Sequence, residues 1–307
     1  MWVDGRTINL ILLNYNKSLL LMRNVIVPKL KSISLIGQLS SLYATFQNSS
    51  PDEDLNFDLN QLAFTGPLLT LPICSYLKTT KSNYSISDNS PIKSYLDTIE
   101  FPGGVNSIPE FKEQIQKEKN YIPISILHRE KPVERERLEG LFSAMVYKTV
   151  NKLETAGIQS AIYYPIAELV ANIFDHSKED KGFIFGQFYP SKNFLDICIV
   201  DRGRGLALAY KQEKNLELSD DDAIIEAMKG NSTKPDKERG YGVRTSKQVV
   251  CGALGGEFVF ISGSSALVLV GKSEKLVALP NFFWRGVIIA YRIPVPSSPI
   301  DISAYLE

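Results

Sequence analysis

Two apolar runs joined by a turn-forming segment of four residues constrain the fold of this chain more than any other feature. The runs are Phe183–Tyr189 and Phe194–Val200, and the sequence PSKN separates them. Runs of this length with a turn-forming segment between them are typical of a β-hairpin. Three later segments are expected to be strands as well, namely Glu257–Ser262, Ala266–Val270 and Gly286–Pro294. This part of the chain therefore predicts a mixed, mostly antiparallel sheet.

The sequence before and between these strands shows helical periodicity. Apolar residues recur every three or four positions from Leu138 to Leu153, which predicts a long amphipathic helix. Further helices are expected from about Ala161 to His176, from Asp220 to Lys229 with Ser219 as the N-cap, and after Gly242. Helices beside such a sheet predict an α+β fold, built as a two-layer α/β sandwich.

The region before residue 120 is expected to form a separate small α/β domain. A turn signal, FPGG, begins at Phe101, and the charged stretch FKEQIQKEKN ends at Asn120. We therefore predict one domain over residues 1–120 and a second over residues 121–307. Within the first domain, a helix is expected over Leu68–Leu77.

Charge and cysteine usage exclude several classes of protein. Lys and Arg total 34, as do Asp and Glu, so the formal net charge is zero and broad electrostatic binding of nucleic acid is disfavoured. Three scattered cysteines and two histidines supply neither a disulfide framework nor a CxxC-type zinc site. The apolar stretch Ile8–Pro28 contains too many polar residues for a membrane span or a secretion signal. A cytoplasmic location is expected.

A row of polar side chains lies along one side of the helix expected at Ala161–His176. Glu168, Asn172 and Asp175 follow one another at spacings of four and three, which places them together on a helix that turns about 100° per residue. The opposite side is apolar and is expected to pack on the sheet. The row is either the solvated face of an ordinary helix or a set of polar groups that faces a ligand.

A glycine-containing segment follows the predicted hairpin. The sequence ICIVDRGRG ends an apolar strand in Asp201, with Gly203 and Gly205 after it. A carboxylate at a strand end can accept a hydrogen bond from an exocyclic amine such as that of adenine, and glycines permit close approach of a ligand. A tight turn after a strand is the alternative interpretation.

A second such segment, KGNSTKPDKERGYGVRTSK, carries Gly240 and Gly242 before an expected helix. Free N–H groups at such a helix start favour phosphate binding, and Lys234 and Arg239 add positive charge. The P-loop pattern GxxxxGK[ST] is absent, as is the GxGxxG pattern of dinucleotide-binding domains. A surface loop is the alternative interpretation.

In their order along the chain, the three motifs resemble those of the GHKL nucleotide-binding superfamily. They are ExxxNxxD on a helix, DxGxG after a strand and GxG at the start of a helix. The resemblance covers roughly residues 135–295, and ELVANIFDHS and GNSTKPDKERGYGVRTSK are most similar to bacterial histidine-kinase-like ATPase domains. It implies a Bergerat-type ATP-binding fold, with ATP and Mg²⁺ as ligands.

The resemblance also implies roles for individual residues. Glu168 would orient or deprotonate the attacking water or hydroxyl, and Asn172 would hold Mg²⁺. Asp201 would recognise the adenine amine, while Gly203 and Gly205 would let the chain pass beside the base.

The remaining motif residues belong to the phosphate end or to the helix. Gly240 and Gly242 would end a mobile lid over the phosphates, and Lys234 and Arg239 would supply charge there. Asp175 would serve a water network on the adenine side or the helix itself.

Two departures from the family pattern limit what the resemblance implies. Many relatives carry a Gly-Thr pair in the last strand, whereas Val287 follows Gly286 here, so the hydroxyl contact to adenine is not expected. No phosphoacceptor helix is evident either, since His128 is soon followed by Pro132. A kinase that acts on its own histidine is therefore not expected, and His176 is expected to be a structural hydrogen-bonding residue.

The segment LNFDLNQLAFTGPLLTLPICSYL resembles part of a STAS-like regulatory domain, with a generic α/β module as the alternative. Members of that family carry a phosphorylated Ser or Thr at a helix start, and Thr65 lies nearby. Three functions stay open. They are an Mg·ATP-dependent ATPase that signals to a protein partner through the N-terminal domain, an anti-sigma-type Ser/Thr kinase that acts in trans, and a non-catalytic nucleotide-binding module. A homodimer is compatible with the family.

Overall fold

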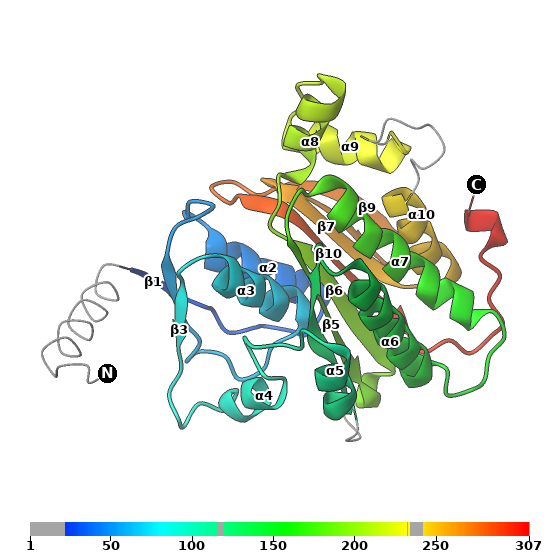
Figure 1. The fold of residues 1–307 in the computed structure, drawn as a ribbon, viewed down its shortest axis with the longest axis horizontal. Coiled ribbons are helices and arrows are strands. Elements are labelled where there is room, and N and C mark those ends of the chain that lie inside the picture. Colours follow the sequence, from blue (N-terminus) through cyan, green and yellow to red (C-terminus); the bar gives the residue numbers. More distant parts are fainter. Residues whose placement is uncertain (1–21, 116–119, 232, 234–241, 307) are drawn as a thin grey trace, which may run out of the picture.

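A seven-stranded sheet forms the centre of the molecule in the computed structural model, which describes residues 22–115, 120–231, 233 and 242–306. The strands lie in the spatial order β4-β5-β6-β10-β7-β8-β9 (Figure 1). Every neighbouring pair is antiparallel, so the prediction of a mixed sheet was wrong for this part of the chain. The strands are β4 (Tyr121–His128), β5 (Lys181–Tyr189), β6 (Phe194–Asp201), β7 (Glu257–Gly263), β8 (Ser265–Val270), β9 (Ser273–Ala278) and β10 (Trp284–Pro294).

The predicted hairpin is confirmed. Strands β5 and β6 pair with Phe183 opposite Val200, and the 3₁₀ turn Pro190–Lys192 connects them. Successive side chains of a strand point to opposite faces of the sheet. In β6, Ile199 faces one hydrophobic core and Val200 faces the other, so this central strand is buried on both sides.

One face of the sheet is covered by the helices that the sequence predicted there. These are α6 (Pro132–Val150), α7 (Ile158–His176) and α10 (Gly242–Gln248), which a π-helical turn, Val249–Ala253, continues. The apolar side of α7 is buried in the same core as Ile199. Helix α7 therefore presents its polar side away from the sheet, as the periodicity predicts.

Two shorter helices lie beyond the end of β6, at the top of Figure 1. They are α8 (Gly205–Lys214) and α9 (Asp220–Lys229), which contact each other as well as β7. The predicted N-cap of α9 is confirmed, because the Ser219 side chain accepts a hydrogen bond from the Asp222 N–H at 3.1 Å. Helix α8 was not predicted from the sequence.

The other face of the sheet is covered by residues from the first third of the chain. Helices α2 (Leu35–Phe46) and α3 (Pro67–Thr79) pack against it, and α3 contacts β5, β6 and β10 (Figure 1). The remaining elements of this region are the parallel strands β1 (Arg23–Ile26), β2 (Leu55–Asp58) and β3 (Asn83–Ser85), with helices α4 (Lys93–Thr98) and α5 (Ile108–Ile115).

The boundary predicted near residue 120 coincides with the start of β4, but the two parts share one hydrophobic core. Phe57 from β2 belongs to the same buried cluster as Val200 from β6 and Ile288 from β10. The large sheet therefore lies between two helical layers, and the expected two-layer sandwich accounts for only one side of it. Physically, a sheet whose strands are apolar on both faces must be covered on both.

A buried polar network ties the two parts together. Arg292 of β10 donates to both carboxylate oxygens of Asp196 in β6, at 2.7 and 2.9 Å. The Gln38 amide from α2 donates to the same carboxylate at 3.0 Å and accepts from the Leu68 N–H at the start of α3, also at 3.0 Å. Asp196 is fully buried, so these partners compensate for the loss of its hydration.

Thr65, the residue considered for phosphorylation, is buried in this structure. Its hydroxyl lies 2.9 Å from that of Thr70, with which it shares a hydrogen bond. A kinase would have to expose this side chain before it could modify it.

No helix in the described part of the chain is both long enough and apolar enough to cross a membrane.

Candidate nucleotide-binding site

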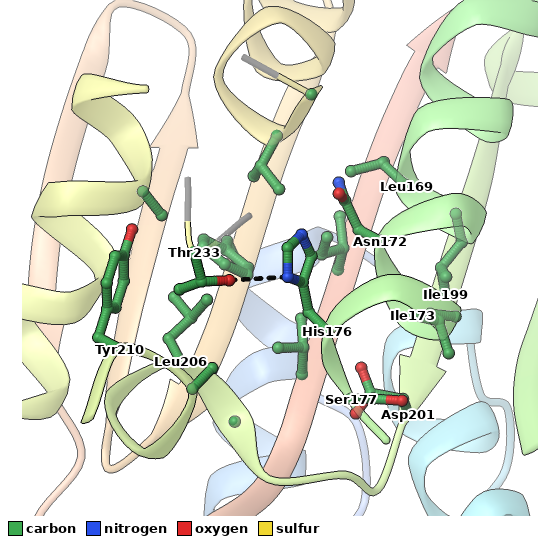
Figure 2. Close-up of a pocket in the computed structure, with 18 of the residues that line it drawn as sticks. Leu169, Asn172, Ile173, His176, Ser177, Ile199, Asp201, Leu206, Tyr210 and Thr233 are labelled. Carbon is green, nitrogen blue, oxygen red and sulfur yellow. Dashed lines mark hydrogen bonds between the residues drawn. The ribbon is translucent and has the colours of Figure 1, made fainter. Parts of the chain in front are cut away.

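A largely apolar cavity lies where α7, α8, α10 and the end of β6 meet (Figure 2). It holds about 810 Å³ of space, including its open mouth. Apolar walls with a few convergent polar groups are typical of small-molecule sites. Its apolar walls come from several elements and include Leu169, Ile173, Ile199, Leu206, Ala209, Val243, Phe260, Val287 and Ile289.

The last two turns of helix α7 contribute polar side chains to this cavity. Asn172 and His176 both line it, with the His176 ring between Asn172 and Asp201 (Figure 2). The Asn172 Nδ2 atom is buried and has no hydrogen-bond partner among the described residues. A buried polar atom without a partner costs free energy, and a ligand that binds it recovers that cost.

Glu168 lies one helical turn before Asn172 and reaches the start of α10. A Cβ atom on Gly242 would lie 2.8 Å from Glu168 Oε2 and 3.1 Å from Asn172 Nδ2. Only a residue without a side chain fits there while both groups keep their places. Gly242 therefore brings the backbone that begins α10 against the carboxylate and the carboxamide of α7.

Asp201 closes the opposite end of the cavity, at the last position of β6. Its carboxylate accepts a hydrogen bond from the Gly203 N–H at 2.8 Å, and its side chain is 4% exposed. Burial raises the pKa of Asp201 to about 7; the hydrogen bond from Gly203 opposes this rise, and the nearby Glu179 carboxylate adds to it. No cation pairs with this carboxylate among residues 22–115, 120–231, 233 and 242–306.

Glycines surround Asp201 because the backbone passes very close to it. Gly286 in β10 has a φ of 105°, and a Cβ there would lie 2.6 Å from Asp201 Oδ1. A Cβ on Gly203 would lie 2.4 Å from the Ser177 carbonyl oxygen, so this residue allows the turn to pack on the end of α7. Gly205 begins α8 with a φ of 70° and lines the cavity directly.

Five polar residues of the lining were not among the predicted site residues, namely His176, Ser177, Tyr210, Asn231 and Thr233. Thr233 Oγ1 and His176 Nδ1 lie 2.7 Å apart, and this hydrogen bond is drawn in Figure 2. Tyr210 of α8 lines the wall opposite α7 and donates from its hydroxyl to the Asn231 carbonyl oxygen. The spacing of four residues from Glu168 to Asn172 and on to His176 could have identified His176, but nothing local identifies Tyr210.

Most of the predicted residues that the structure describes lie around this cavity. Asn172, Asp201, Gly205 and Gly242 line it, whereas Glu168 and Gly203 lie just behind the lining residues.

The other predicted residues do not contribute to the described lining. Asp175 is exposed and lies outside it, because His176 rather than Asp175 continues the row along the inner side of α7. Lys234, Arg239 and Gly240 lie outside the described residues.

The chemistry of the lining suits an organic base more readily than a metal cluster. In the described part of the chain, no group of three or more His, Cys, Asp or Glu side chains could hold a metal ion. A cation at this site would therefore need oxygen atoms from a ligand in addition to Asn172.

Comparisons with known proteins add no relatives. No protein-family model matches this chain, and no curated protein or solved structure matches it significantly.

Proposed function

We propose that this protein binds Mg·ATP in the cavity between α7 and the end of β6 and hydrolyses it. The observation that carries the proposal is Asp201, a buried carboxylate at the end of an apolar cavity with no cation beside it in the described part of the chain. Backbone N–H groups of Gly203 and Val287 donate to it, but without a cation its burial is incompletely compensated, so a further donor from a ligand would stabilise it. The exocyclic amine of adenine is such a donor, and the apolar walls would contact the faces of the base.

The order of groups along the cavity supports a nucleotide rather than a free base. Asn172 lies at the end opposite Asp201, with His176 between them (Figure 2). Its carboxamide has an unused, buried hydrogen-bonding atom, and rotation about the last bond of the side chain can present either nitrogen or oxygen. The base would therefore lie at Asp201 and the phosphates near Asn172.

Asn172 fits a role as the protein ligand of Mg²⁺. A magnesium ion takes few ligands from protein and completes its shell with water and phosphate oxygens, so one carboxamide oxygen suffices. When bound, the ion would neutralise charge on the triphosphate. The described lining contributes neither Lys nor Arg, so a bound ion would add positive charge that these residues do not supply.

Glu168 is the residue that supports hydrolysis rather than binding alone. It stands one turn from Asn172 and close to Gly242, which places its carboxylate beside the proposed phosphate end. A carboxylate there can orient a water molecule and accept its proton as the water attacks the terminal phosphorus. Adenine recognition at Asp201 does not involve Glu168. Substitution of Glu168 should therefore affect hydrolysis without affecting nucleotide binding.

Calorimetry followed by a phosphate-release assay tests the proposal. The wild-type protein should bind ATP, ADP and a non-hydrolysable analogue, with tighter binding of ATP when Mg²⁺ is present, and should release phosphate without any protein substrate. Glu168→Gln should leave ATP affinity within about twofold and reduce turnover by roughly 10²-fold, the scale of general-base catalysis. Glu136→Gln, an exposed glutamate on α6, is the matched control and should keep wild-type turnover.

Other outcomes would replace the proposal. Tight binding without phosphate release would leave a nucleotide-binding regulatory module. Transfer of phosphate to a partner protein would identify a kinase that acts in trans. A wild-type protein that binds no nucleotide would overturn the proposal as a whole.

A further inference from the structure

The turn that carries Asp201 is bound to a loop more than a hundred residues away in the sequence. Arg202, the next residue, donates from Nη2 to Asp52 Oδ1 at 3.0 Å and to the Pro51 carbonyl oxygen. Arg285, which precedes Gly286, donates from Nη1 to Asp52 Oδ2, also at 3.0 Å. One carboxylate from the N-terminal region therefore holds both chain segments that flank the Asp201 carboxylate.

The two arginines are also joined to each other and to the rest of the site. Arg285 Nε donates to the Arg202 carbonyl oxygen at 3.0 Å, and Arg285 Nη2 donates to Glu179 Oε1 at 2.7 Å. Glu179 follows the end of α7, so the cluster connects α7, β6 and β10 with the loop that contains Asp52. We call these four residues, Asp52, Glu179, Arg202 and Arg285, the arginine clamp.

The Arg202 guanidinium packs against two aromatic side chains. Its guanidinium lies 3.9 Å from the centre of the Tyr76 ring of α3 and 5.4 Å from that of Trp284. Its side chain is 3% exposed, whereas that of Asp52 is 58% exposed. The Trp284 indole N–H also donates to the Asp201 carbonyl oxygen at 3.0 Å. The Arg202 side chain is the buried part of the clamp, and Asp52 is its accessible part.

We infer that Asp52 is a positioning residue for the base-recognition turn, through which the N-terminal region sets the affinity of the site for nucleotide. This inference rests on the proposed function and assigns the contact through which the site is regulated. With Asp52 in place, the chain from Asp201 to Leu206 is held on one side by the clamp. On the other side, the Arg204 and Leu206 amides donate to the Ser177 carbonyl oxygen and to Ser262 Oγ.

Thermodynamic reciprocity extends the inference to a partner. If Asp52 strengthens nucleotide binding, bound nucleotide must strengthen the clamp by the same factor. A protein that binds the exposed loop around Asp52 and withdraws its carboxylate would thus lower nucleotide affinity without touching the cavity.

Two measurements on the full chain test the inference. The first is amide hydrogen exchange of residues 203–206 without nucleotide, which should become about threefold to tenfold faster in Asp52→Asn, the range expected for loss of a partly buried charged hydrogen bond. The second is calorimetry with ATP, ADP and AMP. Because the clamp acts at the base end, Asp52→Asn should raise all three dissociation constants by a similar factor, about threefold to tenfold.

Matched variants separate positioning from general destabilisation. Glu53→Gln removes the neighbouring carboxylate, which pairs with Arg23 at 2.7 Å and not with the clamp, and should behave as wild type in both measurements. Asp52→Glu retains the charge and should restore at least half of the lost affinity.

Wild-type exchange and wild-type affinities in Asp52→Asn would overturn the inference, as would equal effects of Glu53→Gln. A loss of affinity for ATP but not for AMP would also contradict it, since the effect would then lie at the phosphate end. If the wild-type protein binds no nucleotide, the proposed function fails, and exchange at residues 203–206 decides on the positioning role alone.

Discussion

Strand β6 carries two buried carboxylates that face opposite sides of the sheet, and their hydrogen-bond partners differ. Asp196 points toward α2 and α3 and is paired with Arg292 and Gln38. Asp201 points toward α7 and is bonded to backbone N–H groups, without a cation among the described residues. Both are almost completely buried, at 0% and 4% exposure. Burial alone therefore does not distinguish a structural carboxylate from one that is available to a ligand.

The difference between these two carboxylates lies in how their desolvation is compensated. Around Asp196 every oxygen has a donor from the protein itself, so the group can serve the fold without any ligand. Around Asp201 the donors among the described residues are backbone N–H groups, and burial raises its pKa to about 7; burial raises the pKa of Asp196 as well, but Arg292 and Gln38 oppose that rise. A strongly perturbed carboxyl in a cavity is a candidate for function, whereas a fully paired one is a candidate for structure.

The largest expected effect is the loss of stability when the buried Asp196–Arg292 pair is removed. Asp196→Ala leaves the Arg292 guanidinium without its main partner in the core, which should lower the free energy of unfolding by about 3–5 kcal/mol. Denaturant titration measures this. Asp88→Ala removes an exposed carboxylate 3.8 Å from Lys93 and should stay within about 0.5 kcal/mol of wild type. If Asp196→Ala lowers the free energy of unfolding by less than about 1 kcal/mol, the Asp196–Arg292 pair does not stabilise the fold to this extent.

Asp201→Asn should have a smaller effect on stability, and of the opposite sign. The pKa of Asp201 in the folded state, about 7, exceeds its ordinary value of 3.8, so the folded state holds the extra proton between these values. The stability from this group is complete below about pH 4 and is lost as pH rises through 7. The neutral Asn avoids this loss. The variant should equal wild type near pH 4 and exceed it near pH 8 by a few kcal/mol at most.

Unfolding of both proteins across pH 4–8 checks this sign. The same variant should bind ATP more weakly, because the acceptor for the adenine amine is altered. A stability difference that stays constant with pH would mean that Asp201 does not change its protonation on folding. Unaltered affinity for ATP would count against its role in base recognition.

Two glycine substitutions test how closely the backbone packs around Asp201 and around the Asp196 network. Gly286→Ala places a Cβ 2.4 Å from the Asp201 carbonyl oxygen at a φ of 105°, so it should destabilise the fold by about 1–3 kcal/mol and weaken nucleotide binding. Gly66→Ala on the other side would place a Cβ 2.5 Å from Gln38 Oε1, an atom of the buried network around Asp196, so it should also destabilise the fold. It should leave nucleotide affinity unchanged. Thermal unfolding and calorimetry separate the two variants, and equal losses of nucleotide affinity would contradict this interpretation of the Asp201 environment.

The smallest expected effect concerns a hydroxyl group near Asp201. Val287 pairs with Asp201 across β10 and β6 and lines the cavity. Val287→Thr adds a hydroxyl that can bond to the base, which should tighten ATP and AMP binding by about twofold to fivefold, the range for one neutral hydrogen bond. Inorganic tripolyphosphate serves as the control ligand and should bind both proteins equally. Weaker AMP binding in the variant would place the base elsewhere in the cavity.

The elements that were predicted correctly are those whose own residues show a local pattern. The hairpin of β5 and β6 and the helices α6 and α7 were found from apolar spacing, and α9 was found from its N-cap Ser219 and the aspartates of its first turn. Strand β9 was missed because its side chains are mostly exposed, as befits an edge strand with charged residues. Strand β4 was missed because it contains Pro123, which the structure tolerates where the pairing register shifts between Ile122 and Ser125.

The sequence by itself determined the candidate site to the level of its motifs. The four-residue spacing of Glu168 and Asn172, the strand that ends in Asp201 and the glycine before α10 are all local features, and local periodicity reports which side of an element is buried. Only the tertiary structure decided that Asp196 pairs with a cation while Asp201 has none beside it in the described ranges, that Thr233 reaches His176, and that Asp52 holds Arg202 and Arg285. These contacts join residues 57 to 233 positions apart. No local pattern encodes them, because they depend on how the two helical layers pack on the shared sheet.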